Sequence, residues 1–208
     1  MMLGARTAAW IGKRLPYDAE VEYLESTGTQ WIDTGVNGYL DFDYDIKFLI
    51  PTPVSPNYYN SFFGAWNSIG NEPRQYAFTN SAAQTFYCGN GQGSQLNMSS
   101  CPQNKIAHFR KYGNTLQLNT IKKTVAYSEP YELDRTLFLF GTNRGTFINR
   151  ALSGTRIYSF ELSLGGEMIL DIISVRKDNV GYMYDRVSGE LFGNAGTGEF
   201  IIGPDKTT

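Results

Sequence analysis

His108 is the only histidine in the chain, so it is the only imidazole that could act as a general base. A Ser–His–Asp or Cys–His centre needs such a base within hydrogen-bond reach of the nucleophile. The segment Lys105–Tyr112 alternates in polarity, and it places His108 on a face with other polar side chains. This pattern favours a histidine on a partly solvated strand over a catalytic base, whether the nucleophile were a serine, Cys88 or Cys101.

Hydrolysis of a glycoside needs two carboxyl groups that flank the sugar bond. Asp41, Asp43 and Asp45 are the best-spaced acids, because alternation places all three on one face of an extended segment. Glu20 and Glu22 share this spacing but have no third acid beside them. The aspartate triple contains no glutamate and precedes a proline-rich stretch. We therefore expect a solvated acidic face, and a protein that is not an enzyme.

Metal ligands are sparse. A structural zinc site takes four protein ligands, and two cysteines with His108 fall short of that number. Calcium takes about six to eight oxygen ligands. The three aspartates lack the central glycine of a calcium loop, and Asp178 and Asn179 with Asp185 form only a scattered set. We expect no metal and no cofactor, with calcium as the one ion to test.

The segment Gly89–Gly93 has the glycine content of a phosphate-binding loop, but no helix pattern follows it in Ser94–Met98. A phosphate cradle of that kind needs a helix N-terminus. We therefore expect a flexible loop between Cys88 and Cys101. The two thiols could bridge this loop, although the sequence favours reduced thiols.

A ligand site built from loops is the remaining chemistry, because binding residues concentrate on connections in β-rich proteins. Rings stack on sugars, and amide or guanidinium groups bind sugar hydroxyls. Two readings stay open: the loop residues form a carbohydrate site, or Trp66 and the tyrosines complete the edge of the core. The candidate binding residues are Tyr58, Tyr59, Trp66, Asn67, Arg74, Asn143 and Arg144.

Alternating polarity and regular turns predict about a dozen short strands and no helix. Asp41–Ile50 is the clearest strand, with apolar side chains on one face only. In Arg156–Leu164 the alternation places Tyr158 on the same side as Phe160 and Leu162. The other expected strands are Ser61–Trp66, Gln75–Thr79, Gln84–Cys88, Lys105–Tyr112, Thr115–Asn119, Lys122–Tyr127, Thr136–Phe140, Glu167–Arg176 and Val180–Asp185.

Composition bounds the class of protein. At 208 residues, with 41% hydrophobic and 14% aromatic residues, the chain suits one well-packed β-domain. A net charge of −2 argues against a general nucleic-acid binder. No apolar run approaches the roughly 20 residues of a membrane span, so we expect no membrane insertion.

The two ends of the domain carry a family resemblance. Tyr23–Gln30 with Ile32–Gly35 resembles the opening of concanavalin A-like, laminin-G-like jelly-roll domains of phages, prophages and gut-bacterial surface proteins. Tyr184–Arg186 and the glycine-rich stretch that ends at Gly203 resemble their closing segment. Such domains often carry a proline just before that segment, and Ile172–Arg176 has none. The resemblance implies an all-β, two-sheet antiparallel jelly-roll sandwich over residues 18–208, with the first and last strands adjacent.

Residues 1–17 form a separate basic segment with no acid before Asp18. Its apolar stretch Ala8–Ile11 is too short for a signal peptide. We expect a docking arm that attaches the domain to a larger assembly, with a flexible leader as the alternative. The proposed docking residues are Leu3, Arg6, Trp10, Ile11 and Arg14.

The resemblance and the lack of a usable catalytic group together favour a non-enzymatic structural or adhesion protein of a phage or prophage virion. A fibre, tail or capsid-decorating protein would be made in the host cytoplasm and then join the particle. Its partners would be other virion proteins, a host-surface glycan and further copies of the chain. The alternatives are a lectin-like domain of a bacterial surface protein and, less favoured, a glycan hydrolase.

Overall fold

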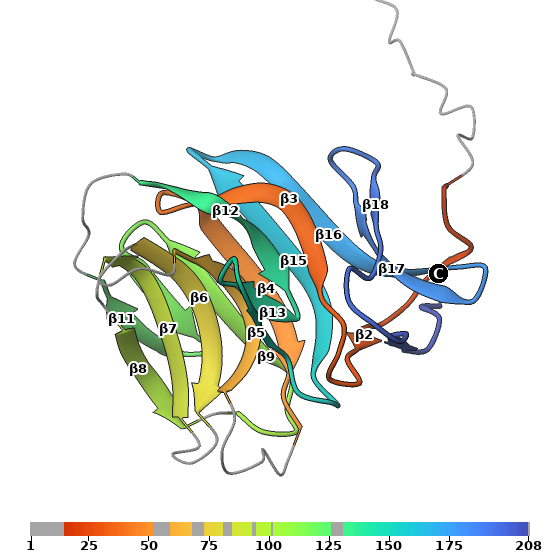
Figure 1. The fold of residues 1–208 in the computed structure, drawn as a ribbon, viewed down its shortest axis with the longest axis horizontal. Helices are drawn as coiled ribbons and strands as arrows, with labels where there is room; N and C mark the ends of the chain where they lie inside the picture. Colours follow the sequence, from red (N-terminus) through yellow and green to blue (C-terminus); the bar gives the residue numbers. More distant parts are fainter. Residues whose placement is uncertain are drawn as a thin grey trace, which may run out of the picture.

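The chain folds into two β-sheets that face each other as a sandwich (Figure 1). The computed structural model describes residues 15–51, 59–67, 73–80, 85–92, 95–100, 102–125 and 131–207. Within these ranges the elements are all strands, and no helix able to cross a membrane occurs. Pairing between strands is antiparallel except for one parallel contact of β13 with β5 and an isolated bridge. The predicted all-β sandwich is confirmed.

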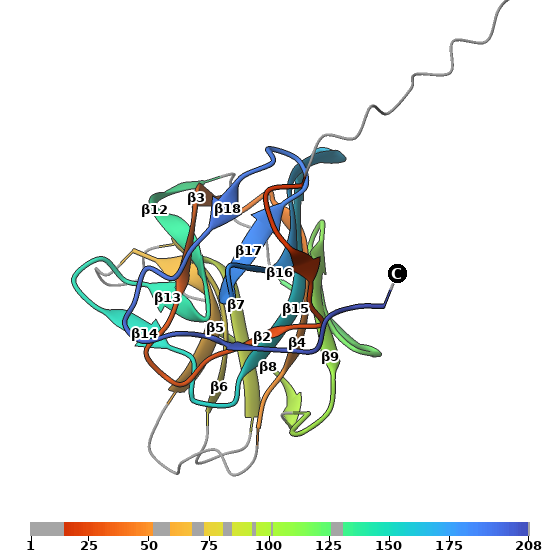
Figure 2. The ribbon, with the colours of Figure 1, turned by 90° about the vertical axis from the view of Figure 1, so that its right-hand side faces the viewer.

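The larger sheet has the order β11-β10-β9-β4-β15-β16-β17-β18, and β1, β2 and β19 pair along its side. Its outer face lies on the right of Figure 2. Its strands are β1 (Ala19–Glu20), β2 (Leu24–Glu25), β4 (Asp43–Leu49), β9 (Ala107–Tyr112), β10 (Thr115–Leu118), β11 (Ile121–Thr124), β15 (Arg156–Leu164), β16 (Glu167–Lys177), β17 (Val180–Asp185), β18 (Leu191–Phe192) and β19 (Ile201–Ile202).

The smaller sheet has the order β14-β13-β5-β6-β7-β8, and β12 joins it to β3. Figure 2 shows part of this layer, with β3, β12, β13 and β14, on the side opposite to β9 and β4. Its strands are β3 (Ile32–Tyr39), β5 (Tyr59–Trp66), β6 (Pro73–Asn80), β7 (Thr85–Gln92), β8 (Gln95–Ser100), β12 (Glu132–Leu139), β13 (Gly141–Asn143) and β14 (Ile148–Arg150).

Aromatic side chains fill the space between the sheets. The apolar face predicted for Asp41–Ile50 is buried, and its polar face points outward. Phe48 stacks on Phe62 of the opposite sheet with ring centroids 4.3 Å apart, and Tyr44 contacts Phe63 at 5.0 Å. Burial of one such ring stabilises the fold by about 1.5–3 kcal/mol.

The expectation of a flexible loop between Cys88 and Cys101 is wrong. β7 continues to Gln92, and β8 then returns beside it in a second antiparallel pair. Met98 on β8 is only 2% exposed and Leu96 is partly buried against the core, so two apolar side chains anchor a strand whose other residues are polar. The glycines and asparagines concealed this pattern. Cys88 is a free thiol in the described structure, and burial raises its pKa well above the ordinary value.

The region of the candidate binding residues Asn143 and Arg144 also contains regular structure. β13 and β14 form a short antiparallel hairpin at the edge of the smaller sheet. Gly145 lies between them with a φ of +76°, a conformation that glycine adopts without strain. The hairpin fixes the positions of the candidate residues Asn143 and Arg144.

The opening and closing segments of the chain lie against each other, as the sequence predicts. β2 pairs with β19, and the amide of Ala195 donates to the carbonyl of Trp31 at 2.9 Å. Between these contacts, the buried amide of Gln30 joins both segments. Its nitrogen donates to the carbonyl of Thr197 at 3.0 Å, and its oxygen accepts from the backbone amide of Thr27 at 2.8 Å.

The motif that begins at Asp185 forms a turn around a buried carboxylate. This carboxylate accepts hydrogen bonds from the backbone amides of Asp171, Val187 and Ser188 and from the hydroxyl of Ser188. Burial alone would raise the pKa of Asp185, but these hydrogen bonds outweigh it and hold the pKa below the ordinary value. The closing segment therefore starts with a turn that this carboxylate holds together.

The start of the described chain is attached to the sandwich one residue before the expected boundary at residue 18. Tyr17 packs edge-on against Tyr184 with ring centroids 5.0 Å apart. The backbone amide of Asp18 donates to the carbonyl of Arg176 at 2.8 Å. The proposed docking residues Leu3, Arg6, Trp10, Ile11 and Arg14 lie outside the described residues.

A substitution at Gly196 tests the contact between the two ends of the domain. A Cβ atom at Gly196 would overlap the carbonyl oxygen of Thr29 and lie 2.7 Å from the ring of Trp31. We expect Gly196→Ala to lower the free energy of unfolding by about 3 kcal/mol, because neither backbone nor indole can move aside freely. Chemical denaturation measures this loss.

Gly193→Ala is the matched control. A Cβ atom at Gly193 would meet only the ring of Tyr182, at 3.4 Å, which is an ordinary contact distance. The control should change the free energy of unfolding by about 0.5 kcal/mol or less. An equal loss in both variants would contradict the role that we give to the Gly196 contact.

Candidate functional site

A row of charged side chains crosses the outer face of the larger sheet. Strand register places Arg110, Asp45, Glu161 and Asp171 opposite one another on β9, β4, β15 and β16. Arg110 pairs with Asp45 at 2.6 Å, and Arg186 holds Asp171 through two hydrogen bonds at 2.8 and 2.9 Å. Glu161 thus lies between two carboxylates that arginines already hold. Like charges in such a row are unfavourable, so Glu161 is well placed to bind a hydrogen-bond donor from outside.

His108 lies beside this row on the partly solvated face that the sequence predicts. Its Nδ1 atom is 3.4 Å from the carboxylate of Asp45 and 3.4 Å from the guanidinium of Arg110. Because both neighbours are charged surface groups, His108 belongs to an ion-pair cluster. None of the contacts described for His108 involves a serine or cysteine nucleophile.

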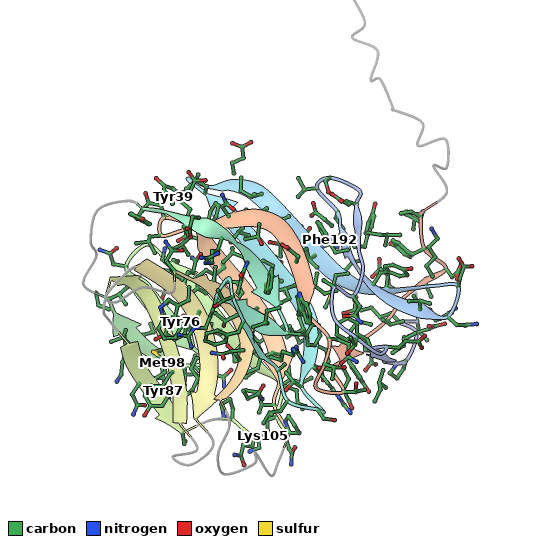
Figure 3. All side chains as sticks on the ribbon, in the orientation of Figure 1. Tyr39, Tyr76, Tyr87, Met98, Lys105 and Phe192 are labelled. Atoms are coloured by element: carbon green, nitrogen blue, oxygen red, sulfur yellow. The ribbon has the colours of Figure 1, made fainter. Side chains whose placement is uncertain are left out.

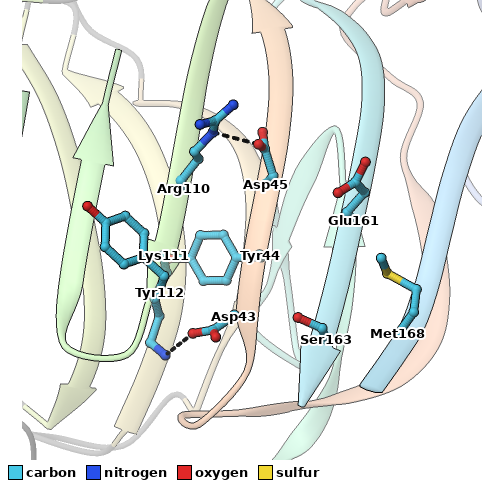
Figure 4. A pocket seen from close by; sticks show the side chains of 9 residues that line it. All are labelled: Asp43, Tyr44, Asp45, Arg110, Lys111, Tyr112, Glu161, Ser163 and Met168. Atoms are coloured by element: carbon cyan, nitrogen blue, oxygen red, sulfur yellow. Dashed lines mark ion pairs between the residues drawn. The ribbon is translucent and has the colours of Figure 1, made fainter. Parts of the chain in front are cut away.

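A shallow hollow of about 310 Å³ opens on this face over β9, β4, β15 and β16 (Figure 4). Tyr112 stands on one side of the hollow and is 40% exposed. Met168 stands on the other side, also exposed, and the carboxylates of Asp43, Asp45 and Glu161 lie between them. The hollow therefore combines one ring, one thioether and several hydrogen-bond acceptors.

Lys111 forms part of the wall of this hollow from beneath. Its side chain points into the sandwich, is almost fully buried, and donates from Nζ to the carbonyl of Phe42 at 2.7 Å. Burial lowers the pKa of Lys111, while the carboxylate of Asp43 at 3.8 Å opposes that shift. Because Arg110 and Tyr112 face the solvent, strand alternation places Lys111 on the inner face with Ala107 and Phe109.

A second hollow of about 380 Å³ lies further along the same face. Tyr158 and Ser159 of β15 line it together with Lys47 of β4. Glu22, from the start of the domain, and Lys206, from its end, complete the wall. The ammonium of Lys47 lies 5.6 Å from the ring centroid of Tyr158, a cation–π distance.

The outward position of Tyr158 overturns an expectation from the alternating pattern. A register shift between Ile157 and Ser159 interrupts the pairing of β15 with β4. Ile157 and Phe160 are therefore both buried, while Tyr158 turns to the solvent side. A β-bulge re-aims side chains in this way, and alternation alone cannot reveal it.

The candidate residues on the smaller sheet form a stack of planar groups. Trp66 stacks on Tyr76, which is labelled in Figure 3, with centroids 5.5 Å apart. The guanidinium of Arg144 lies 3.9 Å from the ring centroid of Trp66 and 4.3 Å from that of Phe147. The strand order β13-β5-β6 places Arg144 and Tyr76 on opposite sides of Trp66. Trp66 therefore presents an edge, and not a free face, to a ligand.

The other predicted binding residues lie around this stack. Asn67 follows Trp66 and is only 4% exposed. The side chain of Asn143 donates to the carbonyl of Thr136 at 3.1 Å and accepts from the amide of Gly145 at 3.0 Å, so it holds the hairpin.

Three predicted binding residues have no described side chain. Tyr59 and Arg74 lie on β5 and β6, and Arg74 pairs in register with Trp66. Tyr58 lies outside the described residues. Of the predicted binding residues, the structure thus brings Trp66 and Arg144 into contact.

Asp178 and Asp185, two of the possible calcium ligands, lie far apart. Asp178 precedes β17 and Asp185 ends it, and the six residues of this strand span about 17 Å. Both carboxylate oxygens of Asp185 also accept hydrogen bonds within its own turn, from the backbone amides of Val187 and Ser188. Across the described ranges, no three His, Cys, Asp or Glu side chains are grouped to hold a metal ion.

No protein-family model matches the chain, and no curated protein matches its sequence.

Replacement of Arg144 tests whether the stack holds the hairpin or is open to a ligand. We expect Arg144→Ala to lower the free energy of unfolding by about 1 kcal/mol, because cation–π contacts with Trp66 and Phe147 are lost. It should also make tryptophan fluorescence easier to quench with acrylamide.

Arg150→Ala is the control, since Arg150 lies 5.3 Å from the ring centroid of Trp31 and not between two rings. It should give the smaller loss. A larger loss in Arg150→Ala, or unchanged quenching in Arg144→Ala, would contradict the stacked arrangement.

Proposed function

We propose that this chain is a non-enzymatic glycan-binding domain of the jelly-roll type, of the kind that phage or prophage particles present to host surfaces. The outer face of the larger sheet supports this proposal best. There, the hollow over β9, β4, β15 and β16 has the exposed ring of Tyr112 on one side, the carboxylate of Asp43 on the next strand, and that of Glu161 further across on β15. A ring that packs on a sugar, with acceptors for its hydroxyls alongside, is a workable carbohydrate site.

The proposal moves the ligand away from the loops that the sequence favoured. Arg144 and Tyr76 cover both sides of Trp66, so stacking on a sugar is better supported at Tyr112. The ammonium of Lys122 lies 5.6 Å from the ring centroid of Tyr112. Even with this contact, Tyr112 remains partly exposed. The loop residues then serve mainly to build the sheet edge.

A binding role suits the acidic groups better than hydrolysis does. Glycosidases need one carboxyl group that donates a proton and a second that attacks the sugar or activates water. Asp45 is the carboxylate opposite Glu161, and Arg110 holds it at 2.6 Å. An arginine in that position orients the carboxylate as an acceptor, so we assign the Asp45–Glu161 pair to recognition.

The biological setting rests on the resemblance of both chain ends to phage, prophage and gut-bacterial domains. In this setting the N-terminal segment attaches the domain to other virion proteins, and several copies present their glycan-binding faces together. The lectin-like alternative, a domain of a bacterial cell-surface protein, would use the same face.

Glycan binding is tested with Tyr112→Ala. We expect the wild-type protein to bind at least one glycan on an array, and Tyr112→Ala to weaken that binding about tenfold, or about 1.4 kcal/mol. Isothermal calorimetry on the selected glycan measures the change. The matched control is Tyr131→Ala, because Tyr131 is also exposed but precedes β12 on the smaller sheet.

Two outcomes would overturn this assignment. Equal losses in Tyr112→Ala and Tyr131→Ala would remove the hollow from the proposed site. Release of reducing sugar from the selected glycan, abolished by Glu161→Gln, would show a hydrolase.

Deletion of residues 1–14 tests the docking segment. This truncation keeps Tyr17 on Tyr184, so we expect an unchanged free energy of unfolding and loss of incorporation into particles. Incorporation is measured by immunoblot of purified particles from a complemented lysogen. Particles that still carry the truncated chain would contradict the docking role.

A further inference from the structure

The two hollows on the outer face lie in line along β4 and β15. On β4, Asp43 and Asp45 line the first hollow and Lys47 lines the second. On β15, Ser163 and Glu161 line the first, and the second begins at Ser159 and Tyr158. Next to β4, Arg110 and Tyr112 of β9 line the first hollow, and Ile106, the residue before β9, lines the second. The line that joins the hollows therefore follows the strand direction.

The length of this line exceeds what one sugar ring fills. From Ser163 to Tyr158 along β15 the backbone covers about 17 Å at the usual rise of a β-strand. The side chains at the two ends are the exposed ring of Tyr112 and the half-buried ring of Tyr158, which Tyr23 contacts edge-on at 5.4 Å and which still lines the second hollow. Two separated rings on one face suit successive units of an oligosaccharide.

The middle of the line is polar and partly exposed. Asp45 on β4 lies between the two rings, and His108, which register places opposite Lys47 at the second hollow, is 3.4 Å from it. They can donate to and accept from sugar hydroxyls without blocking the path, because His108 keeps 41% of its side chain exposed. The face therefore offers contacts along its whole length.

The two ends differ in charge. Asp43 and Glu161 supply acceptors at the first hollow, whereas Lys47 and Lys206 supply donors at the second. The ammonium of Lys206 is 3.5 Å from the carboxylate of Glu20, which partly neutralises it. A chain of neutral sugars satisfies both ends, since each hydroxyl donates and accepts.

We propose that the ligand is a linear, neutral polysaccharide that lies along the strands and is bound within its chain, with one subsite at Tyr112 and a second at Tyr158. This inference rests on the proposed glycan-binding function. It adds the class of ligand, the direction of the chain and a second binding residue.

The test measures affinity against chain length. The probes are laminari-, cello-, malto- and manno-oligosaccharides from disaccharide to hexasaccharide, with chito-oligosaccharides and oligogalacturonates as amidated and acidic counterparts. We expect the wild-type affinity in one neutral series to rise at least tenfold from disaccharide to hexasaccharide. Tyr158→Ala should abolish this rise while it leaves the affinity for the disaccharide unchanged. Tyr112→Ala should weaken every length.

A second arm tests binding within the chain. A polysaccharide of the selected series is reduced at one end and coupled through the other to a solid support, so that no free terminal sugar remains. We expect the coupled polysaccharide to retain the wild-type protein. We also expect it to bind as well as the uncoupled polymer, which should compete for the protein. Loss of retention would show recognition of a chain end and would overturn the inference.

The remaining outcomes separate the two proposals. Disaccharide binding that depends on Tyr112, with no gain from longer chains, would overturn the extended site and leave the glycan-binding function standing. Tighter binding of oligogalacturonate than of every neutral series would overturn the neutral class. No binding of any probe, with an intact fold by circular dichroism, would count against both proposals. Tyr131→Ala is again the control for each series.

Discussion

The buried amide of Gln30 is the interaction that joins the two ends of this domain. Its oxygen accepts from the backbone amide of Thr27 in its own turn, and its nitrogen donates to the carbonyl of Thr197 in the closing segment, so the buried Gln30 amide would be left unsatisfied if the two segments separated. A buried donor or acceptor that loses its partner costs about 1–3 kcal/mol. The same turn reaches across the domain, because the backbone amide of Ser26 donates to Thr155, which in turn bonds to Asn60 of the smaller sheet. One polar chain therefore ties the opening turn to both sheets.

This closure also builds the surface that we assign to binding. Glu22 comes from the start of the domain and Lys206 from its end, yet both line the hollow at Tyr158. They meet there only because β2 pairs with β15 on one side and with β19 on the other. Arg156 strengthens this junction, since it pairs with Glu25 at 2.6 Å and lies 4.2 Å from the ring centroid of Tyr23. The stability of the fold and the shape of the second hollow thus depend on the same contacts.

Alternation predicted most of the strands because most faces are either solvated or buried. It worked best at Asp41–Ile50, where every second side chain enters the core. It failed at β8, where Leu96 and Met98 are the only apolar side chains of the strand, and at Tyr158, where a bulge exchanges the faces. Both failures have a physical cause. A strand needs few apolar contacts once its neighbour supplies backbone hydrogen bonds, and a bulge leaves no trace in polarity alone.

The face that we assign to binding could not be found from composition, because its residues come from strands that are distant in sequence. Only the strand register brings these residues together. Trp66 is a candidate binding residue in the sequence because it adjoins a polar loop, whereas Tyr112 ends a predicted strand. The deciding difference is what stands beside each ring. Trp66 has Tyr76 on one side and Arg144 on the other, so its faces already contribute to the stability of the sheet edge. Tyr112 stands at the wall of a hollow whose floor is acidic, and its ring remains partly open to solvent. A side chain that the fold already uses on both faces has little contact area left for a ligand, so exposure beside a hollow is the better guide to binding than ring size.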